Sequence, residues 1–170
     1  MHVSKYLKLC CFLICLPFLC GASLTSRVKT FGYWNYAPEV YNCQDSPYSE
    51  QEVISAIEFW QMQGFVFGYL HESHDCVLNP PSKGIMIETA NRHTFSNYPS
   101  NLARTFTVYN GLNQIIFSDI QILTKRDRVL EHELGHALGF RHYDKRQHIM
   151  NSIWQDGGWK TDGLFKNQKL

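Results

Sequence analysis

The sequence predicts one α/β domain of mixed α+β type, built on a single twisted and mostly parallel sheet. The chain has 170 residues, 18% charged and 44% hydrophobic, which is ordinary for one globular domain with its own core. Five strand-like segments and two helix signatures occur along it. One helix signature separates the first two strand-like segments, and such crossovers join parallel strands.

The first elements are a strand, a loop and a helix. Residues 27–34, RVKTFGYW, alternate and are rich in aromatic residues, so we expect a strand there. We expect a loop at 35–47. A helix should follow, because Ser49 with Glu52 has capping-box spacing and Gly64 is a natural helix end. Its apolar positions recur at helical spacing: Val53, Ile54, Ile57 and Trp60.

Four more strands are expected after this helix. Residues 65–70 and 84–89 are separated by a loop containing NPPSKG. Residues 103–109 and 113–119 flank an Asn-Gly turn at 110–111, which is typical of a hairpin.

The second helix should begin near Thr124 and end at Gly139. Thr124 and Asp127 resemble a capping box in which Asp replaces the usual Glu. The apolar side of this helix consists of Val129, Leu130, Leu134, Ala137 and Leu138. Residues 143–170 carry only weak signals of secondary structure.

Residues 1–22 have the features of a secretory signal peptide. Lys5 and Lys8 precede an apolar run at 9–20, which is short for a membrane span, and small residues allow cleavage after Ala22. The alternatives are an uncleaved anchor and a lipoprotein with Cys20 as the lipidated residue. The signal peptide predicts a secreted domain at 23–170 with no stable membrane insertion.

The composition of the mature chain argues against a nucleic-acid partner and suggests one disulfide. Without residues 1–22 it has 14 basic and 15 acidic residues, a net charge of about −1, so we expect no nucleic-acid partner. Cys43 and Cys76 remain, and two cysteines in a secreted domain favour one disulfide. The alternatives are two unrelated thiols, or Cys43 as a thiolate that plugs a metal site.

The most specific motif is HELGHALGFRH at 132–142. On a helix, His132 and His136 lie on one face about 6 Å apart, so both can reach one ion. Glu133 is rotated by about 100° and can instead contact a water on that ion. His142 would lie too far along a continuous helix, so its participation requires the chain to turn back at Gly139.

Three neutral imidazoles with a fourth position left for water are typical of a catalytic zinc site. The sequence therefore predicts one catalytic Zn²⁺ held by His132, His136 and His142, with Glu133 as the general base. The alternative is a surface helix whose histidines are solvated.

The motif from His132 to His142 resembles the long zinc motif of metzincin peptidases. Met150 follows His142 at a spacing similar to that of the methionine turn in matrixins, the matrix-metalloproteinase type. Residues 31–40, 100–106 and 115–119 are similar to the first strand, the substrate-binding edge strand and the next strand of that family.

The resemblance implies a metzincin-like catalytic domain at 23–170, with a mostly parallel five-stranded sheet, an active-site helix and a methionine turn. It also implies a zinc endopeptidase that binds protein or peptide substrates in extended conformation, and we expect the protein to be a monomer. A zinc hydrolase acting on non-protein substrates and an inactive binding module are the alternatives. We expect Met150 to pack beneath the site and His148 to make a local hydrogen bond. Solvated or capping roles are expected for His71, His74, Asp75 and His93.

Overall fold

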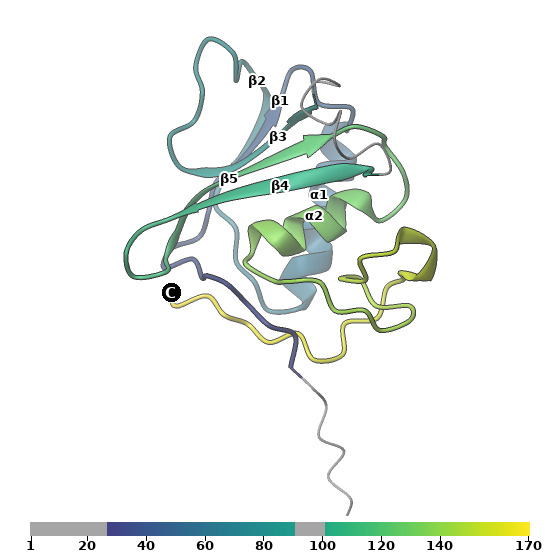
Figure 1. Ribbon diagram of the computed structural model, residues 1–170. Coiled ribbons are helices and arrows are strands. Elements are labelled where there is room, and N and C mark those ends of the chain that lie inside the picture. Colours follow the sequence, from purple (N-terminus) through teal and green to yellow (C-terminus); the bar gives the residue numbers. More distant parts are fainter. Residues whose placement is uncertain (1–26, 91–100) are drawn as a thin grey trace, which may run out of the picture.

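The computed structural model describes residues 27–90 and 101–170, which form one α/β domain with two helices and a five-stranded sheet (Figure 1). The predicted signal peptide lies outside the described residues. The strands are β1 (Val40–Cys43), β2 (Leu70–His74), β3 (Gly84–Thr89), β4 (Ala103–Tyr109) and β5 (Ile115–Ile122). The helices are α1 (Glu50–Met62), α2 (Val129–Ala137) and the short 3₁₀ helix η2 (Trp154–Asp156).

The sheet has the order β2-β1-β3-β5-β4. All neighbouring strands are parallel except β4, which pairs antiparallel with β5 at one edge. This arrangement confirms the predicted fold class, an α/β domain with a mostly parallel sheet. Both helices lie on the same face of the sheet (Figure 1), and buried side chains of α1, α2, β3 and β5 belong to one hydrophobic core.

The prediction of a first strand at 27–34 is wrong. This segment makes only isolated bridges, from Thr30 to Phe140 and from Tyr33 to Gln114. Its aromatic character has another cause, because Trp34 is fully buried in the core. The first strand is β1, which lies in the stretch expected to be a loop.

The second predicted strand is displaced along the chain. Residues 65–70 were expected to be a strand, but β2 begins only at Leu70. Phe65 and Phe67 point into the core, so their alternation reflects burial beneath the sheet rather than strand pairing. The prediction for 84–89 is confirmed.

The predicted hairpin is confirmed, although its turn differs in detail. The strand at 103–109 has the expected bounds, and the next strand runs to Ile122 rather than ending at 119. The left-handed residue of the loop is Asn113, with φ 59°, and not the Asn110–Gly111 pair. The Asn110 side-chain oxygen accepts hydrogen bonds from the N–H groups of Leu112 and Gln114, which closes the loop.

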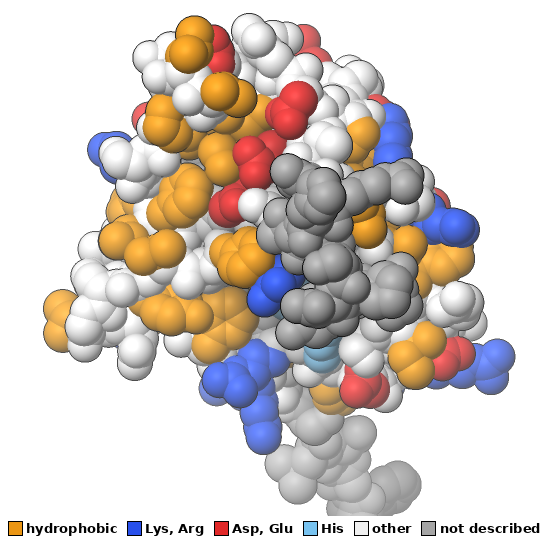
Figure 2. All heavy atoms as spheres, turned by 45° about the horizontal axis from the view of Figure 1, so that its top comes forward, with side chains coloured by type: hydrophobic (Ala, Val, Ile, Leu, Met, Phe, Trp, Pro, Cys, Tyr) orange, Lys and Arg blue, Asp and Glu red, His pale blue; other side chains and the backbone are white. Residues whose placement is uncertain are grey.

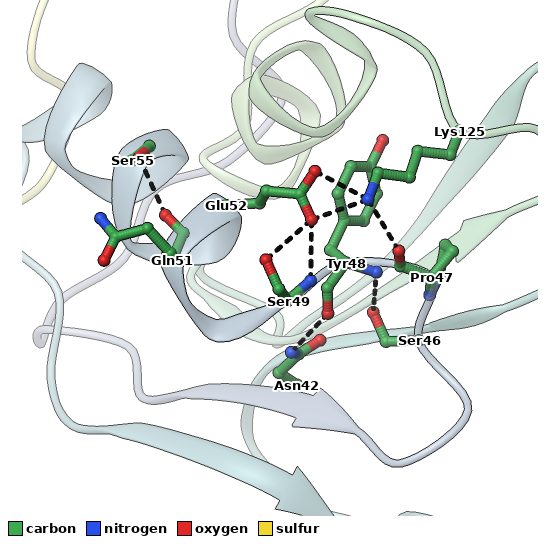
Figure 3. A network of polar contacts seen from close by, with 9 residues as sticks. All are labelled: Asn42, Ser46, Pro47, Tyr48, Ser49, Gln51, Glu52, Ser55 and Lys125. Carbon is green, nitrogen blue, oxygen red and sulfur yellow. Dashed lines mark hydrogen bonds and ion pairs between the residues drawn. The ribbon is translucent and has the colours of Figure 1, made fainter.

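Helix α1 begins as its sequence predicts. The Glu52 carboxylate accepts hydrogen bonds from the backbone N–H and the hydroxyl of Ser49, both at 2.9 Å (Figure 3). Lys125 binds the same carboxylate and donates to the Pro47 carbonyl at 3.0 Å. Figure 3 shows this network joining the start of α1 to the loop after β5, which leads into α2. At the other end of α1, Gly64 is left-handed with φ 88°, which confirms the expected helix end.

A disulfide joins Cys43 and Cys76, as predicted. It connects the end of β1 to the segment after β2 and packs against Met86 and Phe117. Closing a loop of this length, with a sequence separation of 33, constrains the unfolded chain by about 3–4 kcal/mol in the chain-entropy estimate. The alternative in which Cys43 is a thiolate plug on a metal is wrong, because its sulfur is bonded to Cys76.

None of the helices in residues 27–90 and 101–170 is sufficiently long and apolar to cross a membrane. The C-terminal residues run back along the N-terminal segment (Figure 1). They are held there by hydrogen bonds between Val28 and Gly163 and between Lys169 and Trp34.

Candidate metal centre

Helix α2 places two histidines one turn apart, and the chain after it brings in a third. The Nε2 atoms of His132 and His136 are 3.1 Å apart. The Nε2 atoms of His136 and His142 are also 3.1 Å apart. One nitrogen from each of the three rings lies within 4.8 Å of the others, so the group could hold a metal ion. The structure therefore brings together the three histidines that the motif singled out.

Gly139 makes this convergence possible. Helix α2 ends at Ala137, and Gly139 follows two residues later with a left-handed φ of 98°; the Gly139 N–H donates to the His136 carbonyl at 2.9 Å. A Cβ atom here would lie 2.5 Å from the Gly32 carbonyl oxygen. Both the backbone angle and the close approach of Gly32 favour glycine. The predicted turn at this position is confirmed.

The start of α2 differs from its prediction. Thr124 and Asp127 do not cap the helix; it begins at Val129, and Arg128 precedes it in a left-handed conformation with φ 66°. The Asp127 carbonyl instead accepts a hydrogen bond from the Trp154 indole at 2.9 Å. The chain before α2 is therefore held by a residue beyond Met150, and no local side-chain cap forms.

The hydrogen bonds around the rings suit metal binding. The Nδ1–H of His132 donates to the Ile149 carbonyl at 2.7 Å, and that of His136 donates to the Phe140 carbonyl at 2.8 Å. With the proton on Nδ1, each neutral ring presents an Nε2 lone pair to the cluster. Such backbone acceptors orient the imidazoles that bind metals.

The ring spacing fits zinc. Tetrahedral zinc with bonds of about 2.0–2.1 Å holds its ligand nitrogens roughly 3.3 Å apart, close to the 3.1 Å found between neighbouring Nε2 atoms. Lone pairs at this distance repel one another unless a cation lies between them. The donor set of three imidazoles is also one that zinc prefers.

The electrostatic surroundings keep two of the rings neutral. Burial lowers the pKa of His132 to about 4 and that of His136 to about 4. Both imidazoles are therefore uncharged at neutral pH, which is the form that binds a metal.

Glu133 lies in the same cavity and is held by the edge strand. Its side chain is buried, and burial raises the pKa of its carboxyl. The Thr105 hydroxyl, on β4, donates to Glu133 Oε2 at 2.6 Å. A carboxyl with a raised pKa and a fixed orientation is suited to act as a general base.

Met150 and His148 lie where the sequence analysis expected. Met150 is fully buried, and its sulfur packs against Gly135 of α2, beneath the histidine cluster. His148 is buried as well, and its Nδ1 accepts a hydrogen bond from the Met150 N–H at 3.0 Å. Its Nε2–H donates to the Asp162 carbonyl at 3.1 Å, so both ring nitrogens are engaged away from the cluster.

His71 and His74 lie outside the cluster, but His71 has a partner immediately before β1 rather than the solvated or capping role that was expected. His71 Nε2 lies 2.9 Å from a carboxylate oxygen of Glu39, and its ring stacks on Tyr41. The ring of His74 donates to the Asn79 carbonyl at 2.8 Å. His93 lies outside the described residues.

The histidine cluster opens into a cavity of about 660 Å³. Its lining comes from residues 101–105 around the start of β4, from α2 and from residues between 149 and 157, and on the face drawn in Figure 2 a histidine side chain reaches the surface. The edge strand β4 therefore runs beside the histidines, as the resemblance implies. Sequence reasoning placed Thr105 on the substrate-binding edge strand but not in contact with Glu133, and it did not single out Arg126, Arg128 or Trp154, which also line the cavity. Their proximity arises from folding, and no local spacing marks it.

No family model matches the chain, and none of the curated proteins is significantly similar to it. The mixed sheet with one antiparallel edge strand and the three-histidine cluster are compatible with a metzincin-like fold.

Proposed function

We propose that this protein is a secreted, zinc-dependent endopeptidase of metzincin type. The observation that carries the proposal is the convergence of three Nε2 atoms, from His132, His136 and His142, in the cavity that also contains Glu133. The Cys43–Cys76 disulfide and the signal-like N-terminus support secretion. We propose that the chain acts as a monomer.

The substrate would be a protein or peptide in extended conformation. β4 pairs with β5 along one edge only, and none of the described strands pairs with its other edge. A peptide can add to such an edge through main-chain hydrogen bonds, which give affinity without requiring a particular sequence. Because the first residues of β4 line the cavity, the added peptide would pass over the histidines.

Each residue has one task in this proposal. His132, His136 and His142 would hold a zinc ion, and a bound zinc ion would supply Lewis acidity toward the scissile carbonyl and the attacking water. Glu133 accepts the proton of the attacking water and delivers it to the leaving amine. Thr105 holds the Glu133 carboxylate in position through its hydroxyl.

The test is hydrolysis of a peptide library by the purified mature protein, with and without a chelator. We expect cleavage that stops after chelation and returns with zinc. Glu133→Gln should bind zinc and fold normally but lose turnover by about 10²-fold or more, since it removes a general base.

The matched control is Glu58→Gln, because Glu58 is an exposed carboxylate on α1, outside the cavity. It should retain full activity. Near-normal turnover in the Glu133→Gln protein would contradict the mechanism. Zinc binding without cleavage of any peptide would contradict the proposed endopeptidase activity.

A further inference from the structure

Two arginines lie together at one end of the cavity. Arg126 and Arg128 both line it, immediately before the first residue of α2. Their guanidinium carbons lie 5.3 and 5.2 Å from the centre of the Trp154 ring, so the indole is flanked by two cations. The indole is itself fixed by its hydrogen bond to the Asp127 carbonyl. The pair is therefore held in place by Trp154 rather than free to spread into solvent.

Carboxylates of the protein compensate this charge only in part. Arg128 is mostly buried, and it contacts the Asp127 carboxylate at 3.3 Å, but that carboxylate is 70% exposed. Arg126 is exposed and forms no ion pair within residues 27–90 and 101–170. Glu133 is the only acidic residue among the described residues that line the cavity. An exposed ion pair is weak, so this end of the cavity keeps a positive potential.

A third arginine lines the cavity but does not belong to this pair. The guanidinium carbon of Arg104 lies 4.2 Å from the centre of the Phe106 ring, on the edge strand. The inference concerns Arg126 and Arg128, which lie before the first residue of α2.

The position of the two arginines along β4 determines which part of a bound peptide they would contact. The N–H groups of Leu123 and Thr124 donate to the Leu102 carbonyl, which places the start of β4 beside the segment that leads to Arg126. The last residue of β4, Tyr109, instead contacts Phe31, which lines the cavity together with His142. The end of the cavity with Arg126 and Arg128 thus corresponds to the beginning of β4, and the end with Phe31 corresponds to its later part.

A peptide that adds antiparallel to β4 runs against the direction of that strand. Antiparallel pairs are the more common and slightly more stable arrangement. The C-terminal part of the peptide then lies beside Arg126 and Arg128, while its N-terminal part lies beside Phe31.

We infer that this cavity selects peptides that carry an acidic side chain on the C-terminal side of the scissile bond. The inference rests on the proposed peptidase function. Arginine forks bind carboxylates with two parallel hydrogen bonds, and a partly desolvated site strengthens such contacts. The selectivity should therefore depend on charge and weaken with added salt.

The experiment compares pairs of peptides that differ only by Glu or Gln. One set varies each of the three positions after the scissile bond, and the other varies the three positions before it. We expect one or more positions after the bond to favour Glu by roughly 5- to 30-fold in kcat/KM, as expected for a charge-assisted hydrogen bond. Positions before the bond should show no such preference, and raising the salt concentration should reduce the ratio.

Arg126→Gln should bring the Glu/Gln ratio close to one by lowering kcat/KM for the Glu peptides. Arg128→Gln should have the same effect. Arg128 also donates to the Trp154 carbonyl, so its replacement could disturb the fold. Arg126 is exposed, and Arg126→Gln therefore tests the inference even if the Arg128 variant does not fold. The control is Lys83→Gln, which removes one positive charge from an exposed position outside the cavity. It should leave the ratio as in the wild type.

Two outcomes overturn the inference and leave the peptidase function intact: equal cleavage of Glu and Gln peptides, or a preference for Glu before the bond only. If no peptide is cleaved, the proposed function fails. In that case the inference is tested by binding alone: calorimetry measures the affinity of the same peptides for the zinc-loaded Glu133→Gln protein. Tighter binding of the Glu peptides, lost in Arg126→Gln, supports it, and equal binding overturns it.

Discussion

Helix α1 forms polar contacts within its own first turns, to which Lys125 adds one contact from the loop after β5, whereas helix α2 depends on several side chains from distant parts of the chain. In α1, Ser49 donates to Glu52, and the Ser55 hydroxyl donates to the Gln51 carbonyl. The carbonyls at the end of α2 accept hydrogen bonds from the Trp34 indole, to Ala137 O at 2.9 Å, and from the Asn167 amide, to Leu138 O at 3.0 Å.

The middle of α2 shows the same dependence. The Trp60 indole, on α1, donates to the Glu131 carbonyl at 2.8 Å. Gly135 lies directly against Met150 and Trp60. The helix that carries the histidines is therefore placed by the whole fold, and small changes in its surroundings should move the site. Helix α1 should tolerate comparable changes.

The largest difference is expected at the glycine that follows each helix. Both Gly64 and Gly139 are left-handed, with φ 88° and 98°. Around Gly64 the nearest atom to an added Cβ is Lys166 Cδ at 4.0 Å, whereas Gly139 faces the Gly32 carbonyl oxygen at 2.5 Å. Gly139→Ala should cost roughly 2–5 kcal/mol, from backbone strain and the clash together, and Gly64→Ala only about 1–2 kcal/mol.

Urea unfolding of the two variants, with zinc removed, measures this difference. Gly139→Ala should in addition weaken zinc binding, because it displaces His142, while Gly64→Ala should bind zinc normally. Equal losses of stability in the two variants would show that the close contact between Gly139 and Gly32 does not contribute to the stability of the end of α2.

A second contrast uses the glycine inside α2. In an exposed helix, Gly→Ala usually stabilises by about 1 kcal/mol. At Gly135 the added Cβ would overlap Met150 Sδ and lie 2.7 Å from Trp60 Cζ2. We therefore expect Gly135→Ala to destabilise by about 1–3 kcal/mol, opposite in sign to its helix propensity. Chemical denaturation of the metal-free protein checks the sign, and a gain in stability would contradict the packing described for this helix.

Contacts of α2 should also affect activity. Thr105→Val keeps the shape of the side chain but removes the hydroxyl that donates to Glu133. Losing one orienting hydrogen bond should lower kcat by roughly 5- to 20-fold, with little change in KM. Thr105→Ser should restore most of the rate, which a purely structural loss would not allow. Unchanged kcat in the valine variant would show that Thr105 does not position the base.

The smallest effects are expected at the predicted helix starts. Ser49→Ala removes the hydroxyl of a confirmed capping pair and should cost about 1 kcal/mol. Thr124→Ala removes an exposed hydroxyl from a capping pair that was predicted but does not form, and should change stability by less than about 0.5 kcal/mol. Thermal unfolding of both variants compares them directly. A larger loss in Thr124→Ala would mean that local capping does contribute to α2.

The same contrast explains how much of the fold could be predicted from the sequence. Strands 84–89 and 103–109 and the start of α1 were predicted well because alternation, turn residues and a capping pair act locally. β1 was missed because Val40–Cys43 is short and becomes a strand through its neighbours β2 and β3. The start of α2 was missed because Trp154, rather than Thr124, provides its contact.

The candidate site divides in the same way. The spacing of the three histidines and the role of Gly139 as a turn are local, and the structure has both. The contact between Thr105 and Glu133 joins residues 28 positions apart, and the stacking of Arg126 and Arg128 on Trp154 is also remote in sequence. Such contacts follow from the packing of β4 and α2 and leave no periodic signal.

The central claim, that the fold assembles one zinc site from α2 and the chain beyond Gly139, is tested most directly by metal content. The purified mature protein should contain about one zinc ion per chain. His142→Ala should lose most of it while keeping its circular dichroism spectrum, and His74→Ala, a histidine outside the cluster, should keep it. A wild-type protein that binds no zinc after incubation and dialysis, or full zinc retention in His142→Ala, would contradict the account.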